Sequence, residues 1–267
     1  MTKKLSIFLL AMVMASQSFA QVNWVKDEKL AISLATAKDQ LILIDFWATW
    51  CGPCRTMDKK LWNTAEMASL SEKVIPLKID IDIHKEIAMR YNITSIPRVL
   101  LITANGDVVW DKTGFSGPND YQEVLNELPK QLGGLSQQLL AKEKFEDQDY
   151  FQAAISYQKL AKETMGEVSS GFLSLSDSYF KKAEKETDSE ELANMSDMYQ
   201  LMNDALRGKH EKALKKMAKI EIPNGHKAAQ ELQSYILAYC YKCDDNQKAF
   251  IAEKEKIKNE EYLNGLN

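Results

Sequence analysis

Short apolar runs alternate with amphipathic segments over the first half of the chain. Four segments have the apolar spacing of helices: residues 27–38, 54–63, 84–91 and 119–131. Between them lie four runs that are typical of buried strands, at residues 41–46, 74–79, 98–102 and 108–110. Asn105-Gly106, between the last two runs, predicts a hairpin turn with positive φ at both residues. The pattern predicts an α/β domain with helices on both faces of its sheet.

The pattern changes near Pro129, and Gly133-Gly134 marks the joint between two halves. Val168 is the only valine beyond this point, and helix-forming residues dominate. Paired amphipathic helices are predicted at residues 136–147, 150–164, 170–184, 190–206, 209–219, 227–242 and 246–258. Small and aromatic residues recur 35 residues apart, which resembles tetratricopeptide repeats, with generic helical hairpins as the alternative. We therefore expect an all-α helical-hairpin repeat domain over residues 135–267.

The first 20 residues have the three parts of an export signal. Lys3 and Lys4 precede an apolar run that is shorter than a membrane-spanning helix needs, and small residues stand at Ser18 and Ala20. We predict a signal peptide over residues 1–20, cleaved after Ala20, with an uncleaved anchor as the alternative. The protein would then be exported to the periplasm or the extracellular space, with a bacterial envelope favoured.

Composition narrows the classes of protein that fit. The 267 residues are 45% hydrophobic and 27% charged, which is globular composition. The 34 basic residues are outnumbered by 38 acidic ones, so we expect no nucleic-acid partner. Four cysteines are too few to staple a fold of this size, which directs attention to their chemistry.

The strongest chemical signal is Trp50-Cys51-Gly52-Pro53-Cys54, between a predicted strand and a predicted helix. A thiolate attacks disulfides, whereas an ordinary cysteine, with a pKa of about 8.5, is mostly protonated at neutral pH. The unpaired N–H groups and the positive dipole end of a helix N-terminus favour the thiolate. We expect Cys51 to be the nucleophile and Cys54, one turn further in, to resolve mixed disulfides.

A zinc half-site and an ordinary structural disulfide are the alternatives for this motif. Zinc normally takes four ligands, and His84 stands alone near this half of the chain. We therefore expect no metal, and no cofactor other than the redox-active Cys51–Cys54 disulfide.

Over roughly residues 24–131 the sequence resembles the thioredoxin family. The matching segments follow in family order: Leu43 to Ala48, the Cys51–Cys54 motif, Ser95-Ile96-Pro97, Asn105-Gly106-Asp107 and Gly114. The resemblance implies a thioredoxin fold, a central mixed sheet flanked by helices, over residues 21–132. It also implies disulfide oxidoreductase activity and a cis peptide bond between Ile96 and Pro97, packed against the disulfide.

The same resemblance implies a substrate-binding surface around the disulfide. The Ile96 backbone would hydrogen-bond extended substrate chains, and Pro97 would keep the thiols from capturing metal. The expected substrate-binding residues are Trp50, Gly52, Pro53, Ile96 and Pro97.

Asp45 is a carboxylate inside an otherwise apolar predicted strand. Burial raises the pKa of a carboxyl, and the resemblance implies that Asp45 lies beneath Cys54 and shuttles its proton. A strand-end aspartate that reaches solvent is the alternative. The family often has a lysine beside this position on the adjacent strand, and we place that position at Pro76.

Cys240 and Cys243 form a second pair near the end of a predicted helix, where residues three apart share a face. A local structural disulfide is our leading prediction. Two free buried thiols, an electron relay to Cys51 and a metal half-site are the alternatives.

These features predict an exported thiol–disulfide oxidoreductase that reduces client protein disulfides. By the resemblance, Cys-Gly-Pro-Cys is typical of reducing thioredoxins, with a potential of about −270 mV against about −120 mV for strongly oxidising relatives. A membrane thiol donor would re-reduce the pair, and the helical domain would hold a partner protein. The alternatives are a disulfide oxidase or isomerase, and a chaperone-like client-binding module with an auxiliary redox site.

Overall fold

The computed structural model describes residues 21–267, so the predicted signal peptide lies outside the described residues. Four strands form one sheet in the order β2-β1-β3-β4, in which β1 and β2 are parallel and the other pairs antiparallel. The strands are β1 (Leu41–Trp47), β2 (Val74–Asp80), β3 (Arg98–Ile102) and β4 (Val108–Thr113). The mixed sheet is confirmed, and all four strands begin at the predicted residues.

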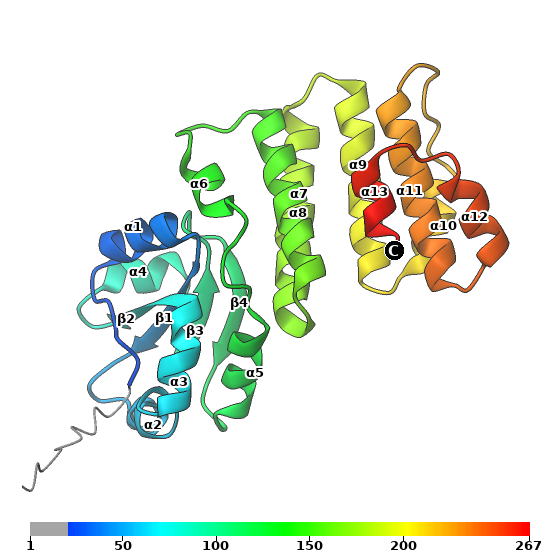
Figure 1. Cartoon of the computed structure of the whole chain (residues 1–267). Helices are drawn as coiled ribbons and strands as arrows, with labels where there is room; N and C mark the ends of the chain where they lie inside the picture. The colour runs from blue at the N-terminus through cyan, green and yellow to red at the C-terminus, as the bar shows by residue number, and fades with distance from the viewer. Residues whose placement is uncertain (1–20) are drawn as a thin grey trace, which may run out of the picture.

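Alternate residues of β1 face two different apolar cores. Leu41 and Leu43 belong to one core, and Ile42, Ile44 and Phe46 belong to the other. The first core is covered by α2 (Gly52–Met57), α3 (Ala65–Leu70) and α5 (Asn119–Glu127), and the second by α1 (Glu28–Lys38) and α4 (Lys85–Arg90) (Figure 1). Helices on both faces explain why β1 is apolar on both sides, with Asp45 as the exception.

The pairing of β1 with β2 corrects the prediction about Pro76. Pro76 lies opposite Leu43, and Lys78 lies opposite Asp45. The error is a shift of two residues, which leaves every side chain of a strand on the same face of the sheet. Because of this, the apolar pattern of β2 could not reveal the shift.

Two local predictions are also wrong in detail. The segment 54–63 is not one regular helix, because α2 ends at Met57 and a π-helix follows at Asp58–Trp62. In the β3–β4 hairpin only Gly106 has positive φ, at 93°, so the turn does not have two such residues. The helix α3 and the 3₁₀ turn at Ser71–Lys73 were not predicted.

The second half of the chain is helical, as predicted. Its elements are α6 (Leu135–Leu140), α7 (Asp147–Glu163), α8 (Gly166–Glu186), α9 (Glu190–Leu206), α10 (His210–Met217), α11 (Lys227–Cys243), α12 (Gln247–Lys254) and α13 (Glu260–Gly265). The helix predicted at residues 136–147 is the shorter α6, and the helix predicted at 246–258 is the shorter α12. The helix α13 was not predicted. Within residues 21–267, no helix is both long and apolar enough to cross a membrane. Assignment to tetratricopeptide repeats stays a prediction.

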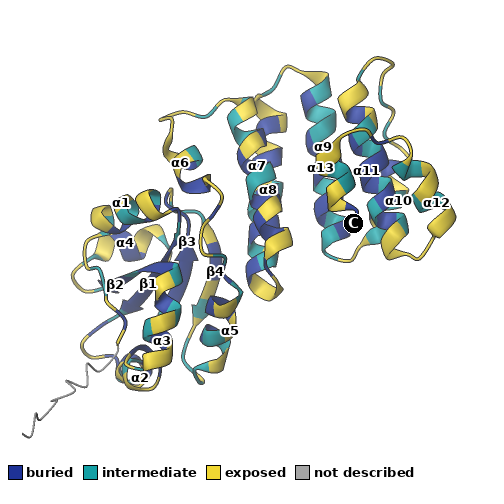
Figure 2. Ribbon diagram, viewed as in Figure 1, coloured by how far each residue is buried: buried dark blue, intermediate teal, exposed yellow. Residues whose placement is uncertain are grey.

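The helix α8 lies along β4, the edge strand of the sheet (Figure 1). Gly171 makes this approach possible, because a Cβ atom at this position would lie 1.8 Å from the carbonyl oxygen of Val109. One apolar core continues from the sheet into the helical domain, and Figure 2 shows buried residues on the sheet and on α7 and α8. The helical domain thus covers a sheet edge that would otherwise be open to pairing.

Hydrogen bonds also fix the joint between the halves. The Asp107 carboxylate, in the β3–β4 turn, accepts from the hydroxyls of Tyr157 at 2.9 Å and Tyr179 at 2.6 Å. The Asp39 carboxylate accepts from the backbone N–H groups of Gly134 at 2.6 Å and Ser136 at 3.0 Å. The two glycines at the joint therefore lie in a hydrogen-bonded turn rather than in a free linker.

We expect Gly171→Ala to destabilise the protein by about 1–3 kcal/mol, as overpacking typically does. The added methyl group would force α8 away from Val109. Urea unfolding of the full chain measures the effect, with Ser174→Ala, at an exposed position of the same helix, as the control. An increase in stability, as expected for glycine to alanine in an unobstructed helix, would contradict the proposed contact.

Candidate active site

Cys51 and Cys54 form a disulfide at the start of α2. Cys51 is the N-cap residue, and its Sγ accepts a hydrogen bond from the Cys54 N–H at 3.1 Å. Pro53 lies in the first helical turn, where its missing N–H leaves no hydrogen bond unmade. The Cys51 sulfur thus lies at the helix end that best stabilises a thiolate.

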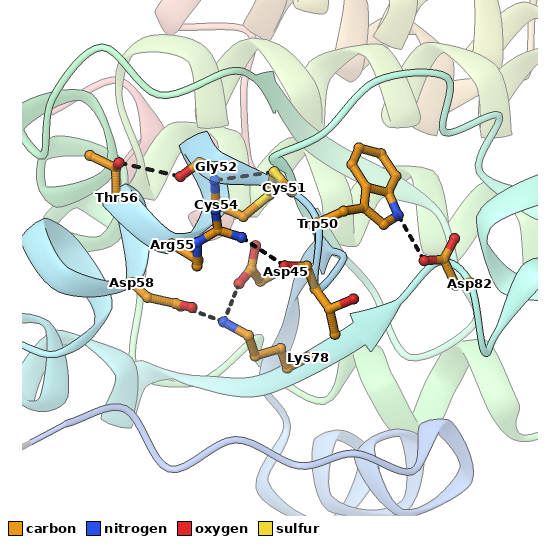
Figure 3. Close-up of a disulfide and its surroundings, with 11 residues drawn as sticks. Asp45, Trp50, Cys51, Gly52, Cys54, Arg55, Thr56, Asp58, Lys78 and Asp82 are labelled. Atoms are coloured by element: carbon orange, nitrogen blue, oxygen red, sulfur yellow. Dashed lines mark hydrogen bonds and ion pairs between the residues drawn. A yellow bond between two sulfur atoms is a disulfide. The ribbon is translucent and has the colours of Figure 1, made fainter.

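An exposed aromatic side chain lies beside the disulfide. Both cysteines are only 3% exposed, whereas the neighbouring Trp50 is 63% exposed. The Trp50 indole N–H donates to Asp82 Oδ2 at 2.8 Å, which holds the ring beside Cys51 (Figure 3). Asp82 was not predicted, and no local pattern in the sequence links it to Trp50.

The Ile96–Pro97 peptide bond is cis, as the resemblance implied. Ile96 packs against the cluster formed by the two cysteines, and Pro97 is buried. The Pro97 carbonyl accepts from the Gly114 N–H at 2.8 Å, which ties the start of β3 to the end of β4. The residues expected to bind substrate, from two segments far apart in the sequence, therefore meet at the disulfide.

The Asp45 side chain is only 3% exposed, which rules out the alternative of a solvent-facing aspartate. Figure 3 draws its carboxyl between the disulfide and Lys78. Asp45 Oδ2 accepts from Lys78 Nζ at 2.9 Å, while Oδ1 is buried and has no hydrogen-bond partner among the described residues. Burial raises the pKa of Asp45, although the Lys78 charge partly opposes the rise.

Lys78 has a second carboxylate partner that sequence analysis missed. Its Nζ lies 2.5 Å from Asp58 Oδ1 and within 5.0 and 5.2 Å of the ring centroids of Trp24 and Trp47. Asp58 is four residues after Cys54, so the helical spacing could have indicated a shared face. Trp24 precedes the first helix, and only the tertiary fold brings it to Lys78.

The predicted local disulfide between Cys240 and Cys243 is not formed, and both thiols are free. Both residues lie within α11, where Cys240 is buried and Cys243 is exposed, so their side chains point to different environments. A disulfide needs an S–S distance of about 2.0 Å and a restricted Cβ geometry, which spacing along a helix does not by itself provide. Burial raises the pKa of Cys240 to about 12 and also raises that of Cys243, which disfavours a thiolate at either.

A disulfide at a helix N-terminus, next to a cis-proline and above a buried carboxyl, defines a disulfide oxidoreductase with the thioredoxin fold. The family model described as Thioredoxin matches residues 21–128. The thioredoxin of Bacillus subtilis (strain 168) is 36% identical over 92 residues, which are 34% of this chain and 86% of that protein. Thioredoxin-1 of Drosophila melanogaster is 39% identical over 89 residues, 33% of this chain and 78% of that one. The chain belongs to the thioredoxin family.

Two solved structures match about two fifths of the chain. Reduced thioredoxin pre-protein of Schistosoma mansoni is 32% identical, with a TM-score of 0.32, and covers 40% of this chain and 96% of that one. The C-terminal domain of Neisseria meningitidis DsbD, in the oxidised form, is 21% identical, with a TM-score of 0.35. The match covers 39% of this chain and 97% of that one. The family model ends at residue 128, before the helices α6 to α13.

We expect ionisation of Asp45 to lower the stability of the oxidised protein as pH rises. Its pKa is raised in the folded state, so between the unfolded and folded pKa values the folded protein binds more protons. The free energy of unfolding should therefore fall above about pH 4. The total loss is about 1.4 kcal/mol for each unit by which the folded pKa of Asp45 exceeds its unfolded pKa. This loss should be absent from Asp45→Asn.

Urea unfolding of both proteins between pH 4 and pH 8 measures this difference. Glu72→Gln, which removes an exposed carboxylate, is the control and should follow the wild type. A stability difference between wild type and Asp45→Asn that does not change with pH would contradict the shifted ionisation.

Proposed function

We propose that this protein is an exported thiol–disulfide oxidoreductase that reduces disulfides in client proteins. The observation that carries the proposal is the position of the Cys51 sulfur, which caps α2 and accepts a hydrogen bond from the Cys54 N–H. A thiolate at this position would be stabilised by the same N–H group and by the helix dipole. The expected leader over residues 1–20 supports export, because its composition matches a signal peptide.

The reaction begins from the dithiol form. The Cys51 thiolate attacks one sulfur of the client disulfide, the client S–S bond breaks, and the other client sulfur leaves as a thiolate. Cys54 then attacks the Cys51 sulfur, which releases the second client thiol and forms the Cys51–Cys54 disulfide. Two electrons pass from the protein to the client. The two protons that the client thiolates take up balance the one that Cys51 lost on ionising and the one that Cys54 loses before it attacks.

Asp45 would act as the proton acceptor for Cys54. The Cys54 thiol must lose its proton before it attacks, and the Asp45 carboxyl is the buried base drawn beneath it (Figure 3). A carboxyl with a raised pKa can both take this proton and return it, because proton exchange is most efficient when the pKa lies near the working pH.

The client would contact the apolar side chains that flank the disulfide. Trp50 is exposed, Ile96 is partly buried against the cysteines, and Ile83, next to Asp82, is 71% exposed. Gly52 has no side chain to obstruct an approaching chain, and Pro53 and Pro97 shape the two sides of the site. An extended backbone at the Ile96 peptide would bring a client sulfur to Cys51.

The direction of electron flow rests on the Cys-Gly-Pro-Cys sequence, which is typical of reducing thioredoxins. A membrane thiol donor would restore the dithiol after each cycle. The helices of the second half would present a surface to a partner protein, as helical repeats do. A disulfide oxidase or isomerase, and a chaperone-like module with an auxiliary redox site, are the alternative functions.

We expect Cys54→Ala to remain covalently attached to clients. Without the resolving sulfur, the mixed disulfide between Cys51 and the client has no internal route to release. Incubating the reduced full-length variant with a disulfide-bearing protein such as insulin, followed by non-reducing electrophoresis, measures the adduct.

The matched control is Cys51→Ala, which keeps the Cys54 thiol but loses the nucleophile and should form little adduct. Wild type should form none that persists. Equal adduct from the two single variants would contradict the roles proposed for Cys51 and Cys54.

A further inference from the structure

The Asp45 carboxyl is buried, yet the proposed reaction requires it to gain and lose a proton. Four titratable groups surround it: Cys54 from α2, Lys78 from β2, Asp58 from the π-helix and Tyr121 from α5. Burial raises the pKa of Tyr121, and the Asp45 charge raises it further, so this phenol stays neutral in the working range. Lys78 and Asp58 are left as the charges that act on Asp45.

The position of Lys78 restricts which anions it can pair with. Its ammonium lies over the rings of Trp24 and Trp47, and 2.9 Å from Asp45 and 2.5 Å from Asp58. No other carboxylate among residues 21–267 lies within 4.0 Å of it, the limit for a salt bridge. Burial lowers the pKa of Lys78, but the two carboxylates more than offset this, so the net pKa is raised and the ammonium stays charged.

One ammonium cannot neutralise two carboxylates. With both carboxylates ionised, the three groups carry a net charge of −1, which is unfavourable away from water. The side chains differ in exposure, at 3% for Asp45 and 28% for Asp58. The more buried carboxyl therefore has the greater tendency to hold a proton, and Asp58 adds to the rise in the pKa of Asp45 that burial causes.

We propose that Asp58 is a positioning residue of the redox site, which shares Lys78 with Asp45 and thereby sets how readily Asp45 exchanges a proton with Cys54. This inference rests on the proposed role of Asp45. During client reduction the Cys54 S–H bond breaks, the proton moves to the Asp45 carboxylate, and the sulfur keeps the electron pair with which it attacks Cys51. The bond between Cys51 and the client sulfur breaks as the Cys51–Cys54 bond forms, and the client leaves as a thiolate. Asp45 then returns its proton, which balances the proton that the client thiolate takes up. Without Asp58, Lys78 would pair with Asp45 alone and favour its ionised form.

The proton affinity of Asp45 can be measured directly by following its labelled carboxyl carbon by NMR as a function of pH. The sample is the reduced full-length protein, as wild type, Asp58→Asn and Asp58→Glu. We expect Asp58→Asn to lower the titration midpoint of Asp45 by roughly 1 pH unit, since a neighbouring negative charge is removed. Asp58→Glu keeps the charge and should stay close to wild type.

Two further variants make the comparison specific. Glu72→Gln removes one exposed carboxylate elsewhere and should leave the Asp45 midpoint unchanged. Asp58→Ser gives a second neutral side chain, so the result does not depend on how asparagine packs. An Asp45 midpoint in both neutral variants that equals wild type, or moves no more than in Glu72→Gln, would overturn the inference.

A rate measurement separates this inference from the proposed function. A preformed mixed disulfide on Cys51 is allowed to resolve, and the rate of client release is recorded against pH. We expect the pH profile in Asp58→Asn to shift downward by the same amount as the Asp45 midpoint. A shifted midpoint with an unchanged rate profile would support the role of Asp58 in tuning Asp45 and overturn the role proposed for Asp45 in the chemistry of Cys54.

Discussion

A carboxylate in the middle of β1 can be buried because the parallel strand β2 places an ammonium opposite it. An unpaired buried carboxylate costs several kcal/mol of folding free energy even after relaxation. The Asp45–Lys78 pair therefore constrains how β2 and the segment that carries Trp24 are placed against β1. In the register of the two strands, Asp45 and Lys78 are direct partners. Val25, in the segment that carries Trp24, exchanges backbone hydrogen bonds with Pro76 and Lys78 of β2, which brings Trp24 to cover the ammonium.

The two halves of the chain meet on the side of the sheet away from this pair. The edge strand β4 is covered by α8, whose Gly171 allows backbone contact, while β2 with Lys78 is the opposite edge strand. Because apolar packing and the bonds to Asp107 join the halves, the helices stand in a defined orientation to the disulfide. A partner bound to the helices would be presented to Cys51 in that orientation.

The sequence allowed the local features of the fold and site to be predicted. The strands follow from short apolar runs, and the Cys51–Cys54 disulfide from a motif of consecutive residues. Features that depend on tertiary placement were missed, because Asp82 and Trp24 reach the site through packing that no periodicity encodes. Helical spacing could have placed Asp58 on the face of Cys54, but its ion pair with Lys78 depends on the fold. The error at Pro76 has the same origin, since a shift of two residues keeps the same strand face. At Cys240 and Cys243, spacing was correct evidence of proximity along a helix but did not imply a bond.

The reduction potential of the Cys51–Cys54 pair determines the direction in which electrons flow between this protein and its clients. It is measured by equilibrating the full chain with defined ratios of reduced and oxidised dithiothreitol at pH 7 and quantifying free thiols. We expect a potential of about −270 mV, as in reducing thioredoxins. A value of about −120 mV would contradict the reductase function and favour an oxidase built on the same fold.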